Sequence, residues 1–464
     1  MTRRTATGLL FGLPFISPAQ ESQRPESFKI YTDQPRLLLT RNRLKLLRRE
    51  RERRSLRWDQ FETLWNGNAE FQEPGFANGL HYQLTENLGS AKKAVLWALT
   101  PAATDMRQIA LVADWCFAAG TPAITPQEQT RLTVKLKNFL ETSKATKISD
   151  ARDRAFSAIA ICDAEPELAA KTLQYLFENF WLSSYLPAIR SAKLHISNSD
   201  AYPLMELFHA FRDNLNFDLR DNFPTFFKQF PLTHLLSHYP APFPASQNEF
   251  RIPAEPNILQ KEPDLQKAVL SRAAEFAMVA FDANAPETQV VQGWLTNDRF
   301  LMRGTAGIPY ELLWANPYQP GLSYYHIPLA IHDEIGGQLF VRSSWEDNAT
   351  WVGFFEGNLQ LFQDGGVTML DPQLKREPLD LEEATVFFAR SSRKFQLPTR
   401  KSEDPKVEIR TDDVFVVGLE PKRRYHVEID DQEMFEEMAD PGGIIFLPGV
   451  RTSVGVRLNP VPTD

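Results

Sequence analysis

The apolar residues of this chain change their spacing near residues 321–365, and this change constrains the fold more than any other feature. Before it, apolar residues recur at the three- and four-residue spacing of amphipathic helices; after it, they form short alternating or β-branched runs typical of strands. At 464 residues the chain is too long for one compact core, so two domains are expected. The stretch is also rich in Tyr, Trp, Arg and His, and clefts tend to form where domains meet.

The helical half should consist of antiparallel hairpins. Stretches of helical spacing are separated by short Pro, Asp, Asn or Gly breaks, which favours neighbouring helices packed side by side. We expect helices near residues 88–100, 104–119, 126–143, 150–163, 166–181, 199–213, 221–237 and 264–283. Thr40 and Thr125 should cap helices, and Gly120 should end one. Because no fixed-period repeat motif occurs, an incomplete α/α toroid over residues 21–335 is predicted rather than a regular solenoid.

The remaining residues, 336–464, are predicted to form an antiparallel β-sandwich. Strands are expected near residues 338–342, 351–355, 384–388, 407–410, 414–419, 426–429, 444–447 and 454–458. The segment around Tyr425 has the spacing of a tyrosine corner, in which the hydroxyl bonds to backbone a few residues upstream. Tyr425 is therefore assigned a structural role.

The first twenty residues have the order of an export signal. Arg3 and Arg4 precede a short apolar segment and then Ser17-Pro18-Ala19, and the paired arginines would also suit a twin-arginine signal. A disordered tail is the alternative. No later run is long enough to cross a membrane, so a periplasmic or secreted protein is expected.

The net charge argues against nucleic acid as a partner. The net charge of −8 gives no overall basic field for nucleic acid. The basic run at residues 41–57 is typical of a solvated helix face, although it could also bind an anionic polymer.

Neither metal nor cofactor is predicted. His234 and His238 have the i, i+4 spacing of metal ligands, but no third ligand is evident near them in the sequence. The two cysteines lack metal-type spacing, and phosphate-loop and dinucleotide motifs are absent from the sequence.

Two segments carry a resemblance to a known family. Pro35-Arg36-Leu37-Leu38-Leu39-Thr40 and the segment RSSWEDNATW at residues 342–351 resemble heparinase II/III-like polysaccharide lyases. That family joins an α/α toroid to a β-sandwich, and the order of elements here is similar. The resemblance implies an exported carbon–oxygen lyase that cleaves an acidic, uronate-containing polysaccharide by β-elimination.

The implied chemistry assigns roles to particular residues. An amide or Arg must neutralise the uronate carboxylate, while a Tyr or His takes the proton and another donates one to the leaving oxygen. By resemblance, Asn198 neutralises the carboxylate and Tyr324 or Tyr325 donates the proton. His195 would be the base, because Ser199 stands where the family has His. The residues expected to hold the sugar are Arg342, Tyr202, His326 and Trp345.

Other interpretations stay open. The family's His-Gly-His stretch is replaced here by Phe355-Glu356-Gly357-Asn358, so the activity has diverged or been lost. A non-catalytic carbohydrate-binding or scaffold protein is one alternative. A glycoside hydrolase is another, using carboxylates such as Asp200 with Glu206 or Asp153 with Asp163. Simple structural roles also remain: helix capping by Asn198, interface packing by Tyr324 and Tyr325, and stacking of Arg342 on Trp345.

Overall fold

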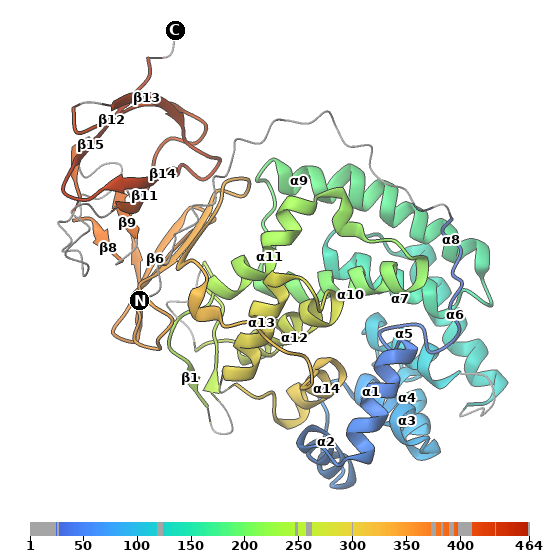
Figure 1. Cartoon of the computed structure of the whole chain (residues 1–464). Helices are drawn as coiled ribbons and strands as arrows, with labels where there is room; N and C mark the ends of the chain where they lie inside the picture. Colours follow the sequence, from blue (N-terminus) through green and yellow to red (C-terminus); the bar gives the residue numbers. More distant parts are fainter. Residues whose placement is uncertain are drawn as a thin grey trace.

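The chain combines a helical N-terminal part with several β-sheets (Figure 1). The computed structural model describes residues 25, 27–117, 124–245, 249–256, 262–298, 300–372, 377–381, 384–388, 394–397, 411–431 and 433–462. The predicted export signal at residues 1–20, the predicted helix stop at Gly120 and the predicted strand at 407–410 lie outside these residues.

The helices follow the predicted pattern closely. They are α1 (Arg41–Glu52), α2 (Leu56–Asn66), α3 (Pro74–Thr85), α4 (Leu88–Ala98), α5 (Met106–Cys116), α6 (Pro126–Thr142), α7 (Ile148–Ala160), α8 (Pro166–Tyr175), α9 (Leu186–Arg190), α10 (Asn198–Leu215), α11 (Pro224–Leu236), α12 (Leu265–Phe281), α13 (Pro286–Asn297) and α14 (Gly304–Trp314). A π-helical segment, Leu176–Tyr185, continues α8. The caps have the predicted chemistry: Thr40 accepts from the Arg43 amide, and Thr125 forms a capping box with Glu128.

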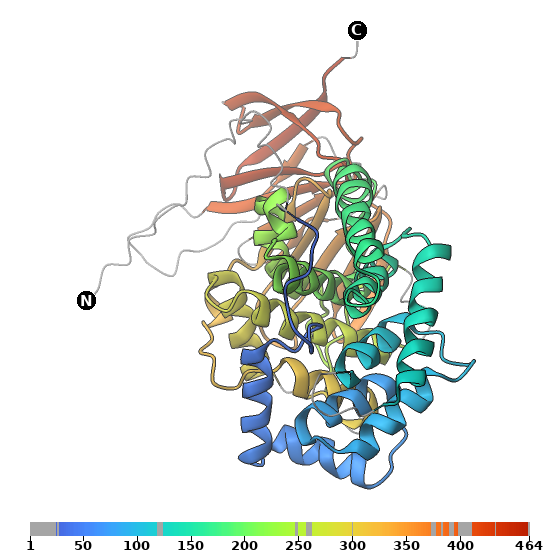
Figure 2. The same cartoon turned by 90° about the vertical axis from the view of Figure 1, so that its right-hand side faces the viewer.

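The last helix of this part returns to the first ones. Helix α14 packs against α2 and α3, so segments far apart in sequence lie side by side, as both views show (Figures 1 and 2). Closure of the helices into a toroid remains a prediction.

The strands form four sheets in the described residues. They are β1 (Phe243–Pro244), β2 (Glu249–Phe250), β3 (Ala330–Asp333), β4 (Gln338–Arg342), β5 (Trp351–Phe355), β6 (Asn358–Gln363), β7 (Gly366–Leu370), β8 (Leu379–Asp380), β9 (Ala384–Phe388), β10 (Lys394–Gln396), β11 (Thr411–Val417), β12 (Arg424–Ile429), β13 (Glu433–Met438), β14 (Ile445–Arg451) and β15 (Gly455–Pro460). β1 pairs with β2, and the larger sheets have the orders β3-β4-β5-β6-β7, β14-β11-β9-β8 and β10-β15-β12-β13.

The three larger sheets stack as layers, and this corrects the predicted two-sheet sandwich. On β9 and β11, alternate residues face opposite layers: Val386 and Phe415 pack with the β3–β7 sheet, whereas Phe387 and Val414 pack with the β10-β15-β12-β13 sheet. The central strands β9 and β11 of the middle sheet are therefore buried on both faces, which explains their runs of consecutive apolar residues. The middle sheet is also not wholly antiparallel, because β9 and β11 run parallel. The tyrosine corner is confirmed, since the Glu420 amide donates to the Tyr425 hydroxyl at 3.0 Å.

The β3–β7 sheet joins the two parts of the chain. Its other face packs into the helical core through Phe340 and Trp351, and the Trp351 indole donates to the Leu236 carbonyl at 2.8 Å. The domain boundary expected at residues 335/336 falls in the turn between β3 and β4. Among the described residues, none of the helices combines the length and apolarity needed to span a bilayer.

Candidate functional site

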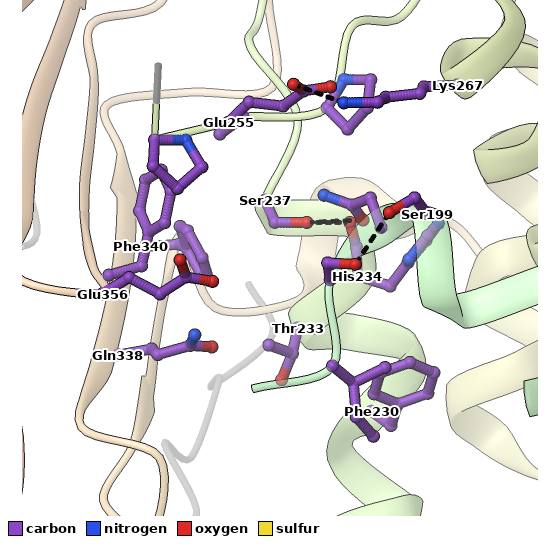
Figure 3. Close-up of a pocket in the computed structure, with 17 residues that line it drawn as sticks. Ser199, Phe230, Thr233, His234, Ser237, Glu255, Lys267, Gln338, Phe340 and Glu356 are labelled. Atoms are coloured by element: carbon purple, nitrogen blue, oxygen red, sulfur yellow. Dashed lines mark hydrogen bonds and ion pairs between the residues drawn. The ribbon is translucent and has the colours of Figure 1, made fainter. Parts of the chain in front are cut away.

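A cavity of about 210 Å³ lies between the helical part and the β3–β7 sheet. Figure 3 shows Gln338, Phe340 and Glu356 on the sheet side, opposite Thr233 and Ser237 on the helix side. Its lining comprises Ile196, Ser197, Asn198, Ser199, Phe230, Thr233, His234, Ser237, Pro253, Ala254, Glu255, Pro256, Lys267, Gln338, Phe340, Phe355 and Glu356. This is the junction at which a cleft was expected.

Asn198 presents its side chain to this cavity. Ser197, not Asn198, caps α10, because the Ser197 hydroxyl accepts from the Asp200 amide at 3.2 Å. The Asn198 carbonyl oxygen accepts from the Ser237 hydroxyl at 3.3 Å. Its amide NH₂ makes no hydrogen bond to a described residue, so it can donate to a ligand.

The 249–256 segment supplies a carboxylate on a second wall. The Glu255 side chain accepts from Lys267 of α12 at 2.7 Å. Its backbone is fixed by Gln360 of β6, which donates to the Glu255 carbonyl at 2.7 Å and accepts from Tyr239 at the same distance. This anchoring holds the loop against the sheet, so Glu255 keeps its place beside the cavity.

The sheet supplies the third wall. Phe340 and Phe355 are buried and form an apolar surface, while Glu356 follows β5 in a left-handed turn at φ 50°. The cavity thus combines rings, hydroxyls, amides and charged groups at a volume suited to a small polar ligand.

Of the eight residues predicted from the resemblance, Asn198 alone lines this cavity. His195 does not line the cavity, although the next residue, Ile196, does; the His195 ring lies beside Gly336 in the turn between β3 and β4. Tyr202 lies elsewhere, in the helical core, where its hydroxyl accepts from the Trp314 indole at 2.9 Å.

The residues predicted from the 321–351 segment form a separate aromatic cluster. Buried Tyr324 lies 5.3 Å from Trp345 and 4.5 Å from Tyr325, ring centre to ring centre. The Arg342 guanidinium lies 4.3 Å from the Trp345 ring, and burial lowers its pKa to about 10. Burial likewise raises the pKa of the Tyr324 hydroxyl. His326 is exposed.

This cluster retains unpaired donors. Arg342 Nη2, Trp345 Nε1 and Trp294 Nε1 are buried without a hydrogen-bond partner among the described residues. Arg342 also lies on the same face of β4 as Gln338 and Phe340, two residues beyond Phe340 along the strand. The aromatic cluster therefore adjoins the cavity without lining it.

The carboxylate pairs proposed from sequence do not face the cavity. Glu206 is fully buried between Arg107 and Arg152, and Asp163 pairs with Arg36 at 2.7 Å. The carboxylates that do line it, Glu255 and Glu356, were missed. The sequence does hold one signal for Glu255, because it lies in the Pro-rich segment 240–263, whose composition is typical of a long loop over one face.

The structure also supplies a third potential ligand for the histidine pair. Glu275 of α12 lies with His234 and His238 in one buried group. No third ligand was evident near the pair in the sequence, because Glu275 follows 37 residues after His238 and only the fold brings it close.

Comparisons with known proteins add little. No family model matches the chain, and no curated protein matches it. A solved structure described as a glycoside hydrolase is similar over 87% of this chain and 74% of its own, at 9% identity and a TM-score of 0.33. This likeness is too weak to assign either a fold or an activity, and the lyase resemblance gains no support from it.

Proposed function

We propose that this chain binds an acidic polysaccharide with one sugar residue in the cavity and cleaves the adjoining glycosidic bond by β-elimination. The observation that carries the proposal is the free amide NH₂ of Asn198 on a wall that also presents hydroxyls and aromatic rings. Hydroxyls and amides match the groups of a sugar ring, and phenylalanine rings pack against its apolar face.

The reaction assigns a role to each group. Asn198 donates to the uronate carboxylate, which stabilises the enolate that forms when the neighbouring proton leaves. Lys267 adds a positive charge on the same lining, although Glu255 shares it. His195, next in the chain to Ile196 of the lining, takes the proton, and a group of the aromatic cluster, Tyr324 or Tyr325, reprotonates the leaving oxygen.

The proposal extends to the fold and the location of the protein. We infer that the helices form an incomplete α/α toroid, and the packing of α14 against α2 and α3 supports this. We further infer export through the first twenty residues to the periplasm or beyond, since a polysaccharide substrate would be met there.

Hydrolysis is a second candidate, favoured by the two carboxylates on one lining. Glu255, which accepts from Lys267 at 2.7 Å, would be the carboxylate that acts as base, and exposed Glu356 would serve as the acid. On this alternative the cavity would bind a neutral sugar, and Asn198 would orient it.

Product analysis separates these reactions. Purified protein is incubated with a panel of uronate and neutral polymers while new reducing ends and ultraviolet absorbance are measured. β-Elimination leaves a conjugated double bond, so both signals should rise together on a uronate polymer. Reducing ends without absorbance would replace elimination by hydrolysis, and binding without either would make the chain a carbohydrate-binding protein.

Matched variants then test the site. Asn198→Ala should lower kcat/KM by roughly 100-fold or more, as loss of one donor to a developing oxyanion typically does. Asn138→Ala, at an exposed position of α6, is the control and should keep full activity. Equal activity of the two variants would refute the assignment of Asn198.

A further inference from the structure

Two histidines and a glutamate from separate helices converge behind the cavity. His234 lies in the last turn of α11, His238 follows just after that helix, and Glu275 lies in α12. One ligand atom from each lies within 4.8 Å of the others, and the three side chains are 2–3% exposed. Buried groups of this kind are the usual ligands of zinc-type ions.

The distances suit a shared ion better than direct hydrogen bonds. Glu275 Oε1 lies 3.9 Å from His234 Nε2 and 3.8 Å from His238 Nε2. Both separations are too long for a hydrogen bond. Tetrahedral coordination with bonds of about 2.0–2.1 Å places ligand atoms roughly 3.3 Å apart, so Glu275 Oε1 would have to move about 0.5 Å closer to each histidine. All three ligand atoms lie within 4.8 Å of one another.

The surrounding bonds already orient the ligand atoms. His238 Nδ1 donates to the His234 carbonyl at 2.8 Å, which places the lone pair of this neutral imidazole on Nε2, the atom that lies 3.8 Å from Glu275 Oε1. Arg272 donates to Glu275 Oε2 at 2.9 Å and thereby turns Oε1 toward the histidines. Such outer contacts are typical of metal sites, where they fix the tautomer and the carboxylate.

Ser271 provides a fourth group. Its hydroxyl lies 2.9 Å from His238 Nε2 and 3.0 Å from His234 Nε2. His234 lines the cavity, but its side chain and those of His238 and Glu275 are only 2–3% exposed, so the group is closed to solvent. Closed four-ligand sites are structural, whereas catalytic ones keep an open position.

We propose that His234, His238 and Glu275 bind a zinc-type divalent transition-metal ion, with the Ser271 hydroxyl or a water molecule as the fourth ligand. The ion links α11 to α12 and fixes the cavity wall that carries His234. The inference does not depend on the proposed reaction, because it concerns metal content and stability rather than substrate.

A metal-free network is the competing explanation. His234 Nε2–H could donate to Ser271, whose hydroxyl donates to His238, whose Nδ1–H donates to the His234 carbonyl. Burial lowers the pKa of His238 to about 4 and raises that of Glu275 to about 7, so the uncharged forms of both are favoured in this setting. The experiment must therefore detect the ion itself.

Metal content of the full chain provides that test. Protein purified without chelator and dialysed against zinc should hold one equivalent by elemental analysis. Cobalt(II) substituted into it should give the intense visible absorption of a four-coordinate site. Added zinc should also raise the thermal midpoint of chelator-treated protein. Absence of both bound metal and the cobalt spectrum would establish the hydrogen-bond network instead.

Variants locate the ion. Glu275→Gln keeps the side-chain volume and a carbonyl oxygen that can accept from Arg272. It should nevertheless lower zinc affinity at least about 100-fold, because loss of a ligand costs more than the 10–100-fold typical of a lost outer contact. Ser271→Ala is a second, milder change should the first fail to fold, and it should shift the cobalt spectrum. His426→Gln, on exposed β12 near Glu436, controls for surface binding and should keep the full metal content. Unchanged affinity in Glu275→Gln would overturn the assignment.

Discussion

The buried carboxylate of Glu206 in the helical core allows a quantitative prediction of stability. Its fully buried carboxylate accepts from Arg107 of α5 at 2.8 Å and from Arg152 of α7 at 2.7 Å. Burial alone would raise its pKa, but the two guanidinium groups outweigh burial and lower it. The three helices α5, α7 and α10 are thus joined through one carboxylate.

Replacing Glu206 by Gln should destabilise the protein by about 3 kcal/mol. Removing one partner of a buried ion pair typically costs about 3–5 kcal/mol, because the other charge is left buried and uncompensated. The low end applies here, since Arg107 keeps Glu73 at 3.0 Å and Arg152 keeps Asp153 at 2.7 Å. The lowered pKa also sets how the free energy of unfolding depends on pH. The ionised carboxylate stabilises the fold above pH 4.5, and this stabilisation is lost as the pH falls below that value.

Urea unfolding followed by far-ultraviolet circular dichroism measures this loss, provided the slope with urea concentration stays constant. Glu141→Gln is the matched control, because Glu141 is exposed at the end of α6 and such surface changes stay within about 0.5 kcal/mol. A loss of stability in Glu206→Gln below about 1 kcal/mol at pH 7 would refute the reasoning. So would a difference in stability between wild type and Glu206→Gln that does not shrink as the pH is lowered.

Two further predictions concern single hydrogen-bonding groups. Tyr425→Phe should cost the β region about 1 kcal/mol, because the Glu420 amide loses its acceptor; exposed Tyr31→Phe should cost nothing in the same unfolding assay. His209 donates from Nε2 to the Ala277 carbonyl and accepts from Arg212 at Nδ1, and burial, with Arg43 and Arg212 opposing Asp213, lowers its pKa to about 4. The unfolded chain therefore takes up this proton at higher pH than the folded one. Stability should fall by up to about 3 kcal/mol between pH 6.5 and 4, and His209→Gln should remove that slope, whereas an unchanged slope would contradict the assignment.

The helices were predictable because their signals are local. Thr125-Pro126 combines a capping hydroxyl with a proline at the first turn, and the structure starts α6 there. Helices α3, α13 and α14 were missed because glycines and, in α14, an internal proline interrupt their pattern, while tertiary packing nevertheless buries them. Local signals also located β4, β5 and β9, yet they could not reveal that β9 runs parallel to β11.

The cavity was less predictable because its walls come from distant segments. Asn198, Glu255 and Gln338 are brought together by packing of the β3–β7 sheet against α11, and no spacing in the sequence encodes that approach. For the same reason, the sequence does not show that Glu275 lies beside the histidine pair. A resemblance can identify one wall residue, but only the fold shows which carboxylates and hydroxyls accompany it.

The aromatic residues at the junction between the helical part and the β3–β7 sheet are explained first by close packing. Gly293 of α13 and Gly321 lie so close that a Cβ on Gly293 would overlap the Leu322 carbonyl, and one on Gly321 would overlap the Gly293 backbone. Tyr324, Trp345 and Trp294 then fill the space beside this contact. Glycine beside large rings is what two surfaces need in order to meet without a gap. The composition that marked residues 321–365 as functional is therefore also the composition of a tightly packed junction, so variants of Asn198 in the cavity test the reaction more directly than variants of these rings.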